Sequence, residues 1–193
     1  NLTLEVLRQR PDGFHEVTLL LQTVSLFDTL TLEEASEISL ECSDASLATS
    51  DNLVVRAARL LQETTASQNG ARMYLEKEIP IAAGLGGGSS DAAATLVGLR
   101  RLWRASVSDE SLIAIAASLG SDVPFFLHGG TAFARGRGDL LRPLPSPVEP
   151  LAVIVTPEEP PSRDKTARLY GLLRERHFSD GSATAEVVRR IEA

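Results

Sequence analysis

A glycine-rich stretch at residues 80–94 contains the side chains and the backbone that are best suited to chemistry in this sequence. Residues 84–88 include four glycines, and a backbone without Cβ atoms can approach a ligand closely. A strand-like segment at residues 72–77 precedes the stretch, and a helix-like segment at residues 92–103 follows it. Two serines and an aspartate at residues 89–91 are suited to cap that helix, whose first-turn amides and dipole favour anions. The stretch therefore predicts a phosphate cradle rather than a plain surface turn.

The two most familiar phosphate motifs do not match this stretch. A Walker A loop ends in Gly-Lys-Ser or Gly-Lys-Thr, and no lysine lies in residues 79–100. Gly84, Gly86 and Ser89 satisfy the dinucleotide fingerprint loosely. However, the acidic residue that this fingerprint needs about 20 residues later is absent, because residues 99–103 still have a helical pattern.

Asp122 is a second side chain that could carry chemistry. It follows Gly120 and precedes an apolar stretch at residues 123–127. A carboxylate at such a place can orient an alcohol and accept its proton. The spacing alone favours a turn or capping aspartate.

The composition excludes several classes of protein. The chain has 193 residues, enough for one large domain or two small ones, and its formal net charge of −7 argues against nonspecific nucleic-acid binding. Apolar runs such as residues 151–155 have the length of core strands, and no signal-peptide pattern is visible. One cysteine, Cys42, excludes an internal disulfide, and three scattered histidines give no zinc pattern. We expect a cytoplasmic protein.

Hydrophobic patterns predict the elements that must position these residues. Period-two alternation predicts strands at residues 2–6, 30–33 and 38–42, and the apolar run at residues 17–27 predicts a buried strand. The first part is therefore expected to be a β-rich sheet of hairpin-like strands. Helix signals follow Asn52 and residues 108–110, and Trp103 is expected to be a core aromatic at the end of the helix after the glycine stretch.

The last part of the chain has a different pattern. Four prolines in residues 142–150 predict a linker without regular structure. Residues 151–155 are expected to form a buried strand that begins a second domain, and residues 163–176 are expected to form a helix.

Three motifs together resemble the GHMP kinase superfamily. Pro80 and residues 84–93 resemble its ATP-binding loop, and residues 120–126 are similar to its catalytic-aspartate motif. Residues 10–16 resemble the substrate turn of those members that act on a cytidyl-diphospho sugar alcohol. The resemblance extends from Asn1 to about residue 157 and is weaker beyond it.

This resemblance implies a fold and a domain organisation. The fold is α+β, with an N-terminal ATP-binding domain at residues 1–148 that resembles ribosomal protein S5 domain 2. Residues 149–193 are expected to be the start of an incomplete C-terminal α/β-sandwich domain. The family's lysine would precede Asn1 by two positions, and the family's third, glycine-rich motif is not seen, so we expect a fragment of a longer protein.

The resemblance also implies an activity: direct phosphoryl transfer from ATP to the 2-hydroxyl of the cytidyl-diphospho sugar alcohol, in isoprenoid precursor biosynthesis by the non-mevalonate route. Asp122 would be the catalytic residue. Mg²⁺ would accompany ATP, with no protein ligand identifiable. The residues expected at the ATP site are Asn52, Lys77, Pro80, Gly84, Leu85, Gly86, Gly87, Gly88, Ser89 and Ser90. Those expected at the substrate are Asn1, Phe14, His15, Asp122 and Phe178.

Structural roles remain open for several of these residues. Phe14 would stack on cytosine and His15 would bond its edge, with Phe178 as a second aromatic, but Phe14 could also cover a hairpin. Asn52 is equally suited to capping a helix and Lys77 to a solvated strand end, and Asn1 could be a frayed terminus with no role at the sugar hydroxyls.

Two alternative functions also remain open. One is another GHMP small-molecule kinase, of the homoserine or mevalonate type, which the turn at residues 11–15 disfavours because a nucleotide-linked substrate explains its aromatic–histidine pair. The other is a non-catalytic S5-like binding module, which the net charge and the glycine stretch disfavour. The expected partners are ATP and a small molecule, without nucleic acid or membrane; no oligomeric state is predicted.

Overall fold

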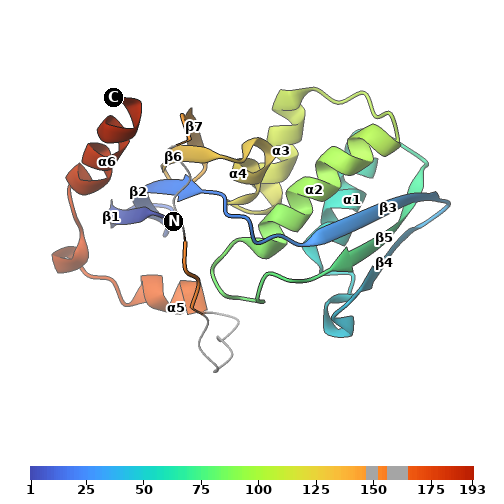
Figure 1. Ribbon diagram of the computed structural model, residues 1–193, viewed down its shortest axis with the longest axis horizontal. Coiled ribbons are helices and arrows are strands. Elements are labelled where there is room, and N and C mark those ends of the chain that lie inside the picture. The colour runs from blue at the N-terminus through green and yellow to red at the C-terminus, as the bar shows by residue number, and fades with distance from the viewer. Residues whose placement is uncertain (147–151, 156–164) are drawn as a thin grey trace. The chain divides into compact units, whose positions relative to one another are not determined.

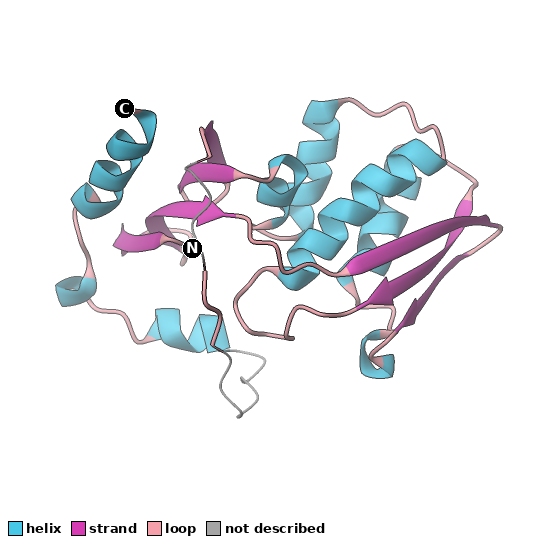
Figure 2. Cartoon of the chain, in the orientation of Figure 1, coloured by secondary structure: helices cyan, strands magenta, loops and turns pink. Residues whose placement is uncertain are grey.

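The computed structural model describes residues 1–146, 152–155 and 165–193, which form two compact units (Figure 1 and Figure 2). One unit consists of Asn1–Val24 and His128–Ala193, and the other of Ser25–Leu127. The expected domain boundary between residues 148 and 149 lies outside the described residues, so that division stays a prediction. Within the described parts, no helix is both long and apolar enough to cross a bilayer.

The unit formed by Ser25–Leu127 contains a three-stranded sheet. Its strands are β3 (Thr29–Ala35), β4 (Ile38–Cys42) and β5 (Gly70–Glu76), in the order β3-β5-β4. β3 is antiparallel to β5, whereas β4 is parallel to it. The expected hairpin pairing between the segments at 30–33 and 38–42 is therefore wrong, because β5 lies between them. A parallel pair needs a long crossover, and the helix α1 (Leu53–Thr64) supplies it between β4 and β5.

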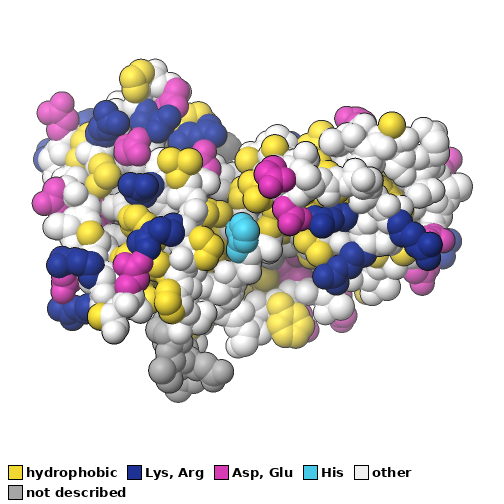
Figure 3. All heavy atoms as spheres, turned by 90° about the horizontal axis from the view of Figure 1, so that it is seen from above, with side chains coloured by type: hydrophobic (Ala, Val, Ile, Leu, Met, Phe, Trp, Pro, Cys, Tyr) yellow, Lys and Arg dark blue, Asp and Glu magenta, His cyan; other side chains and the backbone are white. Residues whose placement is uncertain are grey.

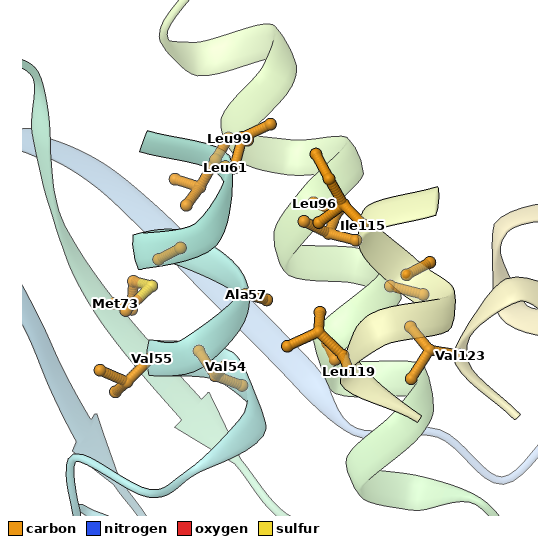
Figure 4. Packing of buried hydrophobic residues seen from close by; sticks show 14 of the residues in the cluster. Val54, Val55, Ala57, Leu61, Met73, Leu96, Leu99, Ile115, Leu119 and Val123 are labelled. Atoms are coloured by element: carbon orange, nitrogen blue, oxygen red, sulfur yellow. The ribbon is translucent and has the colours of Figure 1, made fainter. Parts of the chain in front are cut away.

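Two long helices cover one face of this sheet, α1 and α2 (Gly87–Leu102), and α3 (Asp109–Leu119) packs against both of them (Figure 1). Leu61, Met73, Leu96 and Leu99 are fully buried in the shared core (Figure 4). Each such leucine stabilises the fold by about 1.5–3 kcal/mol relative to an exposed one. Trp103 is buried as predicted, and its indole N–H donates to the carbonyl of Gly70 at 3.0 Å.

The expected cap of α1 is found, and α3 begins at the predicted helix start, whereas the expected caps of α2 are not found. The Asn52 side chain accepts the amide of Val54 at 2.9 Å and donates to the carbonyl of Leu47 at 2.8 Å, which fixes the start of α1. Ser108 caps α3. In contrast, α2 begins at Gly87, after Gly86 in the left-handed conformation, so the serines and the aspartate at residues 89–91 lie inside the helix and do not cap it.

The unit formed by Asn1–Val24 and His128–Ala193 contains an antiparallel sheet. Its strands are β1 (Thr3–Gln9), β2 (His15–Gln22), β6 (Thr131–Arg135) and β7 (Leu140–Leu144), in the order β1-β2-β6-β7. The linker expected from residue 142 is wrong at its start, because Pro143 lies in β7. A proline is tolerated there since β7 is an edge strand, where one missing amide breaks no inner ladder.

The helices α5 (Lys165–Gly171) and α6 (Ser182–Glu192) and the short helical turn η2 (Glu175–His177) belong to the same unit. The short helices η1 (Ala45–Leu47) and α4 (Val123–His128) lie in the Ser25–Leu127 unit, apart from His128. Val188 of α6 is buried against Leu20 and Leu144. The amide of Thr184 in α6 donates to the Glu5 carboxylate at 2.7 Å. These contacts seat α6 on the sheet.

Two predictions for the last part of the chain are wrong. The expected buried strand is absent from the described residues 152–155, where Val153 and Val155 are 89% and 84% exposed. An apolar run becomes a strand only when a neighbour pairs with its backbone. The single helix expected at 163–176 is also wrong over its described part, because α5 ends at Gly171 and η2 follows it.

Candidate active site

The loop between β5 and α2 requires glycine where it meets the helix. Gly86 has φ 73°, and a Cβ atom there would lie 2.7 Å from the ring of Phe126. That distance is shorter than any ordinary carbon–carbon contact. Gly86 therefore lets the loop turn into α2 directly beside the aromatic ring of α4.

A cavity of about 360 Å³ opens over this loop and the start of α2. Such a volume is typical of small-molecule sites. Ser90 does not line it, because its hydroxyl donates back to the carbonyl of Gly87 at 2.7 Å. The other residues predicted for ATP all line it: Asn52, Lys77, Pro80, Gly84, Leu85, Gly86, Gly87, Gly88 and Ser89.

The first turn of α2 presents free amides at this cavity. The first bond of the helix runs from the amide of Ser90 to the carbonyl of Gly86, at 2.8 Å. The amides of Gly87, Gly88 and Ser89 therefore have no acceptor within the helix. Three unpaired N–H groups at the positive end of a 16-residue helix favour a bound anion.

Lys77 is not a solvated strand end. Its side chain is only 10% exposed, and its ammonium forms hydrogen-bonded ion pairs with Asp28 and, at 2.9 Å, with Asp91. Asp28 also accepts the backbone amides of Glu78 at 2.7 Å and Ile79 at 2.9 Å. A cation between two carboxylates thus lies at the base of the cavity, which Lys77 and Asp91 both line.

These three groups have displaced pKa values. Burial raises the pKa of Asp91 to about 6, and the negative charge of Asp28 adds to this effect, although Lys77 opposes it. Burial also acts to raise the pKa of Asp28, but its bonds from Lys77 and the two amides outweigh burial and lower that pKa. Burial acts to lower the pKa of Lys77, and its bonds to both carboxylates outweigh burial and raise it.

The sequence did not predict a role for Asp28 or the ion pair between Asp91 and Lys77. Asp91 was expected to cap a helix, and nothing suggested Asp28. The available signal was an acidic residue among the alanines of a helix that was expected to pack, because a buried carboxylate needs a partner.

Asp122 directly precedes α4, the short helix whose Phe126 contacts the glycine loop. It does not line the cavity. Its side chain is exposed to solvent, although partial desolvation by the surrounding protein raises the pKa of its carboxyl.

The residues predicted for the substrate, other than Asp122, lie in the unit that contains the antiparallel sheet. The ring of His15 lies 6.1 Å from that of Phe178 and 5.2 Å from that of Tyr170, measured between centroids.

The guanidinium of Arg137 lies 4.8 Å from the ring centroid of Phe14, whose side chain is otherwise exposed. The sequence had suggested no contact with the substrate for Tyr170 or Arg137. Asn1 is exposed at the start of the chain.

The turn that holds Phe14 and His15 is well fixed. The amide of Arg10 donates to the carbonyl of Phe14 at 2.8 Å, and the Asp12 carboxylate accepts the amide of Phe14 at 3.1 Å. The guanidinium of Arg10 pairs with both Asp12 and Glu16. These bonds hold the backbone of the turn that carries both rings.

Comparison with known proteins gives consistent relatives. A model of the GHMP kinases N-terminal domain matches residues 52–130. A 4-diphosphocytidyl-2-C-methyl-D-erythritol kinase from Synechococcus sp. (strain CC9902) is 45% identical over 98% of this chain and 64% of its own length. The enzyme of that name from Brevibacillus brevis is 44% identical over 99% of this chain and 65% of its own length. The chain thus spans just under two thirds of these curated relatives.

A solved structure gives the same result. The crystal structure of a 4-(cytidine 5'-diphospho)-2C-methyl-D-erythritol kinase is 38% identical, with a TM-score of 0.75, over 98% of this chain and 68% of that one.

Proposed function

Because the chain belongs to the GHMP kinases, and among them to the 4-diphosphocytidyl-2-C-methyl-D-erythritol kinases, we propose that it transfers the γ-phosphoryl group of ATP to the 2-hydroxyl of 4-diphosphocytidyl-2-C-methyl-D-erythritol. This step belongs to the non-mevalonate route to isoprenoid precursors. Since the reaction consumes ATP, we also propose a cytoplasmic location.

One observation carries the ATP half of this proposal: the glycine loop and the free amides of α2 line a single cavity. The amides of Gly87, Gly88 and Ser89 would bind the phosphates, and no side chain at 86–88 keeps the nucleotide from the backbone. Asn52 and Lys77 would lie nearer the adenine. Pro80, Gly84, Leu85 and Ser90 would shape the loop.

Asp122 is proposed to orient the alcohol and to accept its proton. The alcohol oxygen then attacks the γ-phosphorus as the bond to the β-phosphate oxygen breaks, which releases ADP without a phosphoenzyme. The short helix that follows Asp122 contacts the glycine loop through Phe126, which supports a role for both in one reaction.

The fixed turn at residues 10–16 supports recognition of the cytidine. Phe14 offers an exposed ring for stacking, while the rings of His15 and Phe178 lie edge to face and would hold the pyrimidine ring. Asn1 would contact the sugar alcohol.

Mg²⁺ is proposed only as a companion of ATP. Among the described residues, no group of three or more His, Cys, Asp or Glu side chains could hold a metal, and Asp28 and Asp91 are paired with Lys77. We therefore assign no protein ligand to the metal and derive no step through it.

The alternatives are weaker. A homoserine- or mevalonate-type kinase would have no use for the aromatic turn, and the names of both relatives favour the cytidyl substrate. A nucleic-acid-binding module would need a basic surface, whereas the net charge is −7 and acidic side chains are interspersed with basic ones on the face in Figure 3.

The variant Gly88→Ala tests the phosphate cradle. A Cβ atom at Gly88 would meet only Leu53 at 3.6 Å, an ordinary contact, and alanine favours a helix over glycine by about 1 kcal/mol. The variant should therefore be at least as stable as the wild type. If the amide of residue 88 meets a phosphate, the new methyl group should nevertheless weaken ATP binding, which calorimetry on the full-length protein measures.

Gly171→Ala is the matched control, because a Cβ atom there meets nothing within 4 Å and Gly171 is not part of the cavity. Its affinity for ATP should equal that of the wild type. A stable Gly88→Ala protein with unchanged ATP affinity would contradict the cradle.

A further inference from the structure

The two ends of the glycine loop are joined by one buried ionic cluster. Asp28 accepts the amides of Glu78 and Ile79, which lead into the loop. Asp91 projects from α2, just after the loop ends. The ammonium of Lys77 bridges these two carboxylates, and we call the three residues the Asp28–Lys77–Asp91 clamp.

The clamp lies directly against the loop. A Cβ atom built on Gly87 would be 3.2 Å from Nζ of Lys77 and 3.0 Å from a methyl carbon of Ile79. The ammonium therefore fills the space beneath the first helical residue that lines the cavity. Any shift of Lys77 would move the backbone that we propose to bind the phosphates.

The charges of the clamp are not those of a purely structural contact. Two aspartates whose side chains are 2% and 7% exposed share the ammonium of Lys77, whose side chain is 10% exposed. A buried ion pair already contributes little to stability, because desolvation offsets the attraction, and a second buried carboxylate is more unfavourable still. The raised pKa of the buried Asp91 carboxyl beside the cavity is typical of a functional site.

We propose that Asp28 and Asp91 are positioning residues for ATP, which hold the ammonium of Lys77 between them and so fix both ends of the glycine loop for the triphosphate. The inference rests on the proposed function, since it assigns these residues to the same ATP site. Neither carboxylate needs to touch the nucleotide. Charge-assisted bonds hold the ammonium more firmly than neutral ones would, which explains why carboxylates are used.

The test compares ATP with adenosine, which lacks the phosphates. Asp91→Ala in the full-length protein removes one bond to Lys77, and we expect its dissociation constant for ATP to rise about 10- to 100-fold, the range for losing a charged hydrogen bond. The dissociation constant for adenosine should rise less, because Lys77 is the only clamp residue proposed to lie near the adenine. Asp28→Asn should have the same selective effect, because it weakens the other arm of the clamp.

Steady-state kinetics and a charge-conserving substitution distinguish a positioning role of the clamp from a contribution to folding alone. The KM for ATP should rise in Asp91→Ala while kcat and the KM for the alcohol stay close to wild type. Lys77→Arg, which keeps a cation, should retain more ATP affinity than Lys77→Met. Asp109→Asn is the matched control, because Asp109 pairs with Arg100 at an exposed site and should leave ATP binding unchanged.

The possible results are distinct. If the wild type binds ATP and a folded Asp91→Ala protein binds it equally well, the positioning role is wrong although the ATP site stands. Equal losses for ATP and adenosine would mean that the clamp only holds the fold, which also overturns the inference. A wild-type protein that binds no ATP would overturn the proposed function and this inference together.

Discussion

Asp91→Asn should stabilise the protein at high pH, although we expect it to weaken ATP binding. Burial raises the pKa of Asp91 to about 6, from an ordinary value of 3.8 that we take for the unfolded chain. The folded protein therefore binds this proton more tightly than the unfolded chain does. The stabilisation from protonated Asp91 is complete below pH 3.8 and is lost as the pH rises through 6.

The magnitude follows from the two pKa values. About two pH units at about 1.4 kcal/mol each give about 3 kcal/mol over the whole titration. About half of this, roughly 1.4 kcal/mol, is lost between pH 5 and pH 8. Asparagine resembles the protonated acid in shape and charge and does not titrate. The free energy of unfolding of Asp91→Asn, minus that of the wild type, should therefore grow by about 1.4 kcal/mol from pH 5 to pH 8.

Urea denaturation of the two proteins at pH 5, 6, 7 and 8 measures this difference. The comparison cancels the titration of groups that both proteins share. Asp109→Asn serves as the control, because Asp109 is 79% exposed on its side chain, and its pH dependence should follow the wild type. If wild type and Asp91→Asn show parallel pH dependences, Asp91 does not titrate near pH 6 and the argument about an unfavourable buried charge fails.

The remaining predictions concern the substrate and the chemical step, and both use full-length protein with folding checked by thermal melt. Asp122→Asn keeps the shape of the side chain but removes the base. The kcat should therefore fall by about 10²–10⁴-fold, with little change in either KM. Near wild-type turnover in a folded variant would mean that Asp122 is only a turn residue. Phe14→Ala should raise the KM for the cytidyl substrate and leave the KM for ATP nearly unchanged. The rise should correspond to a loss of about 1–3 kcal/mol in binding free energy, the value for stacking on a base. Equal changes for both ligands would instead indicate a structural role for Phe14.

The family and the α+β fold could be predicted from the sequence, and the comparisons confirm them. The reason is physical: four glycines in five residues leave the backbone open to a ligand, and such a run stands out in the sequence. Sequence signals also predicted those structural features that depend on neighbouring residues. Asn52 was recognised as a cap, and a helix start was recognised at residues 108–110, because a cap bonds to an amide two or three residues away.

Several elements could not be predicted because they depend on partners far away in the sequence. The insertion of β5 between β3 and β4 is set by the packing of the sheet under α1 and α2, which alternation along one strand does not reveal. Pro143 lies in a strand only because that strand is at an edge. Residues 152–155 are apolar but exposed, since hydrophobicity selects a buried position only when a packing surface is available.

The sequence by itself determined the family, the glycine loop and most of the residues around the cavity. Only the tertiary structure decided what Lys77 does. Asp28, Lys77 and Asp91 are separated by 49 and 14 residues, so no spacing rule connects them. Burial brings the three charges together and gives Asp91 its raised pKa, because an ammonium and two carboxylates removed from water must satisfy one another.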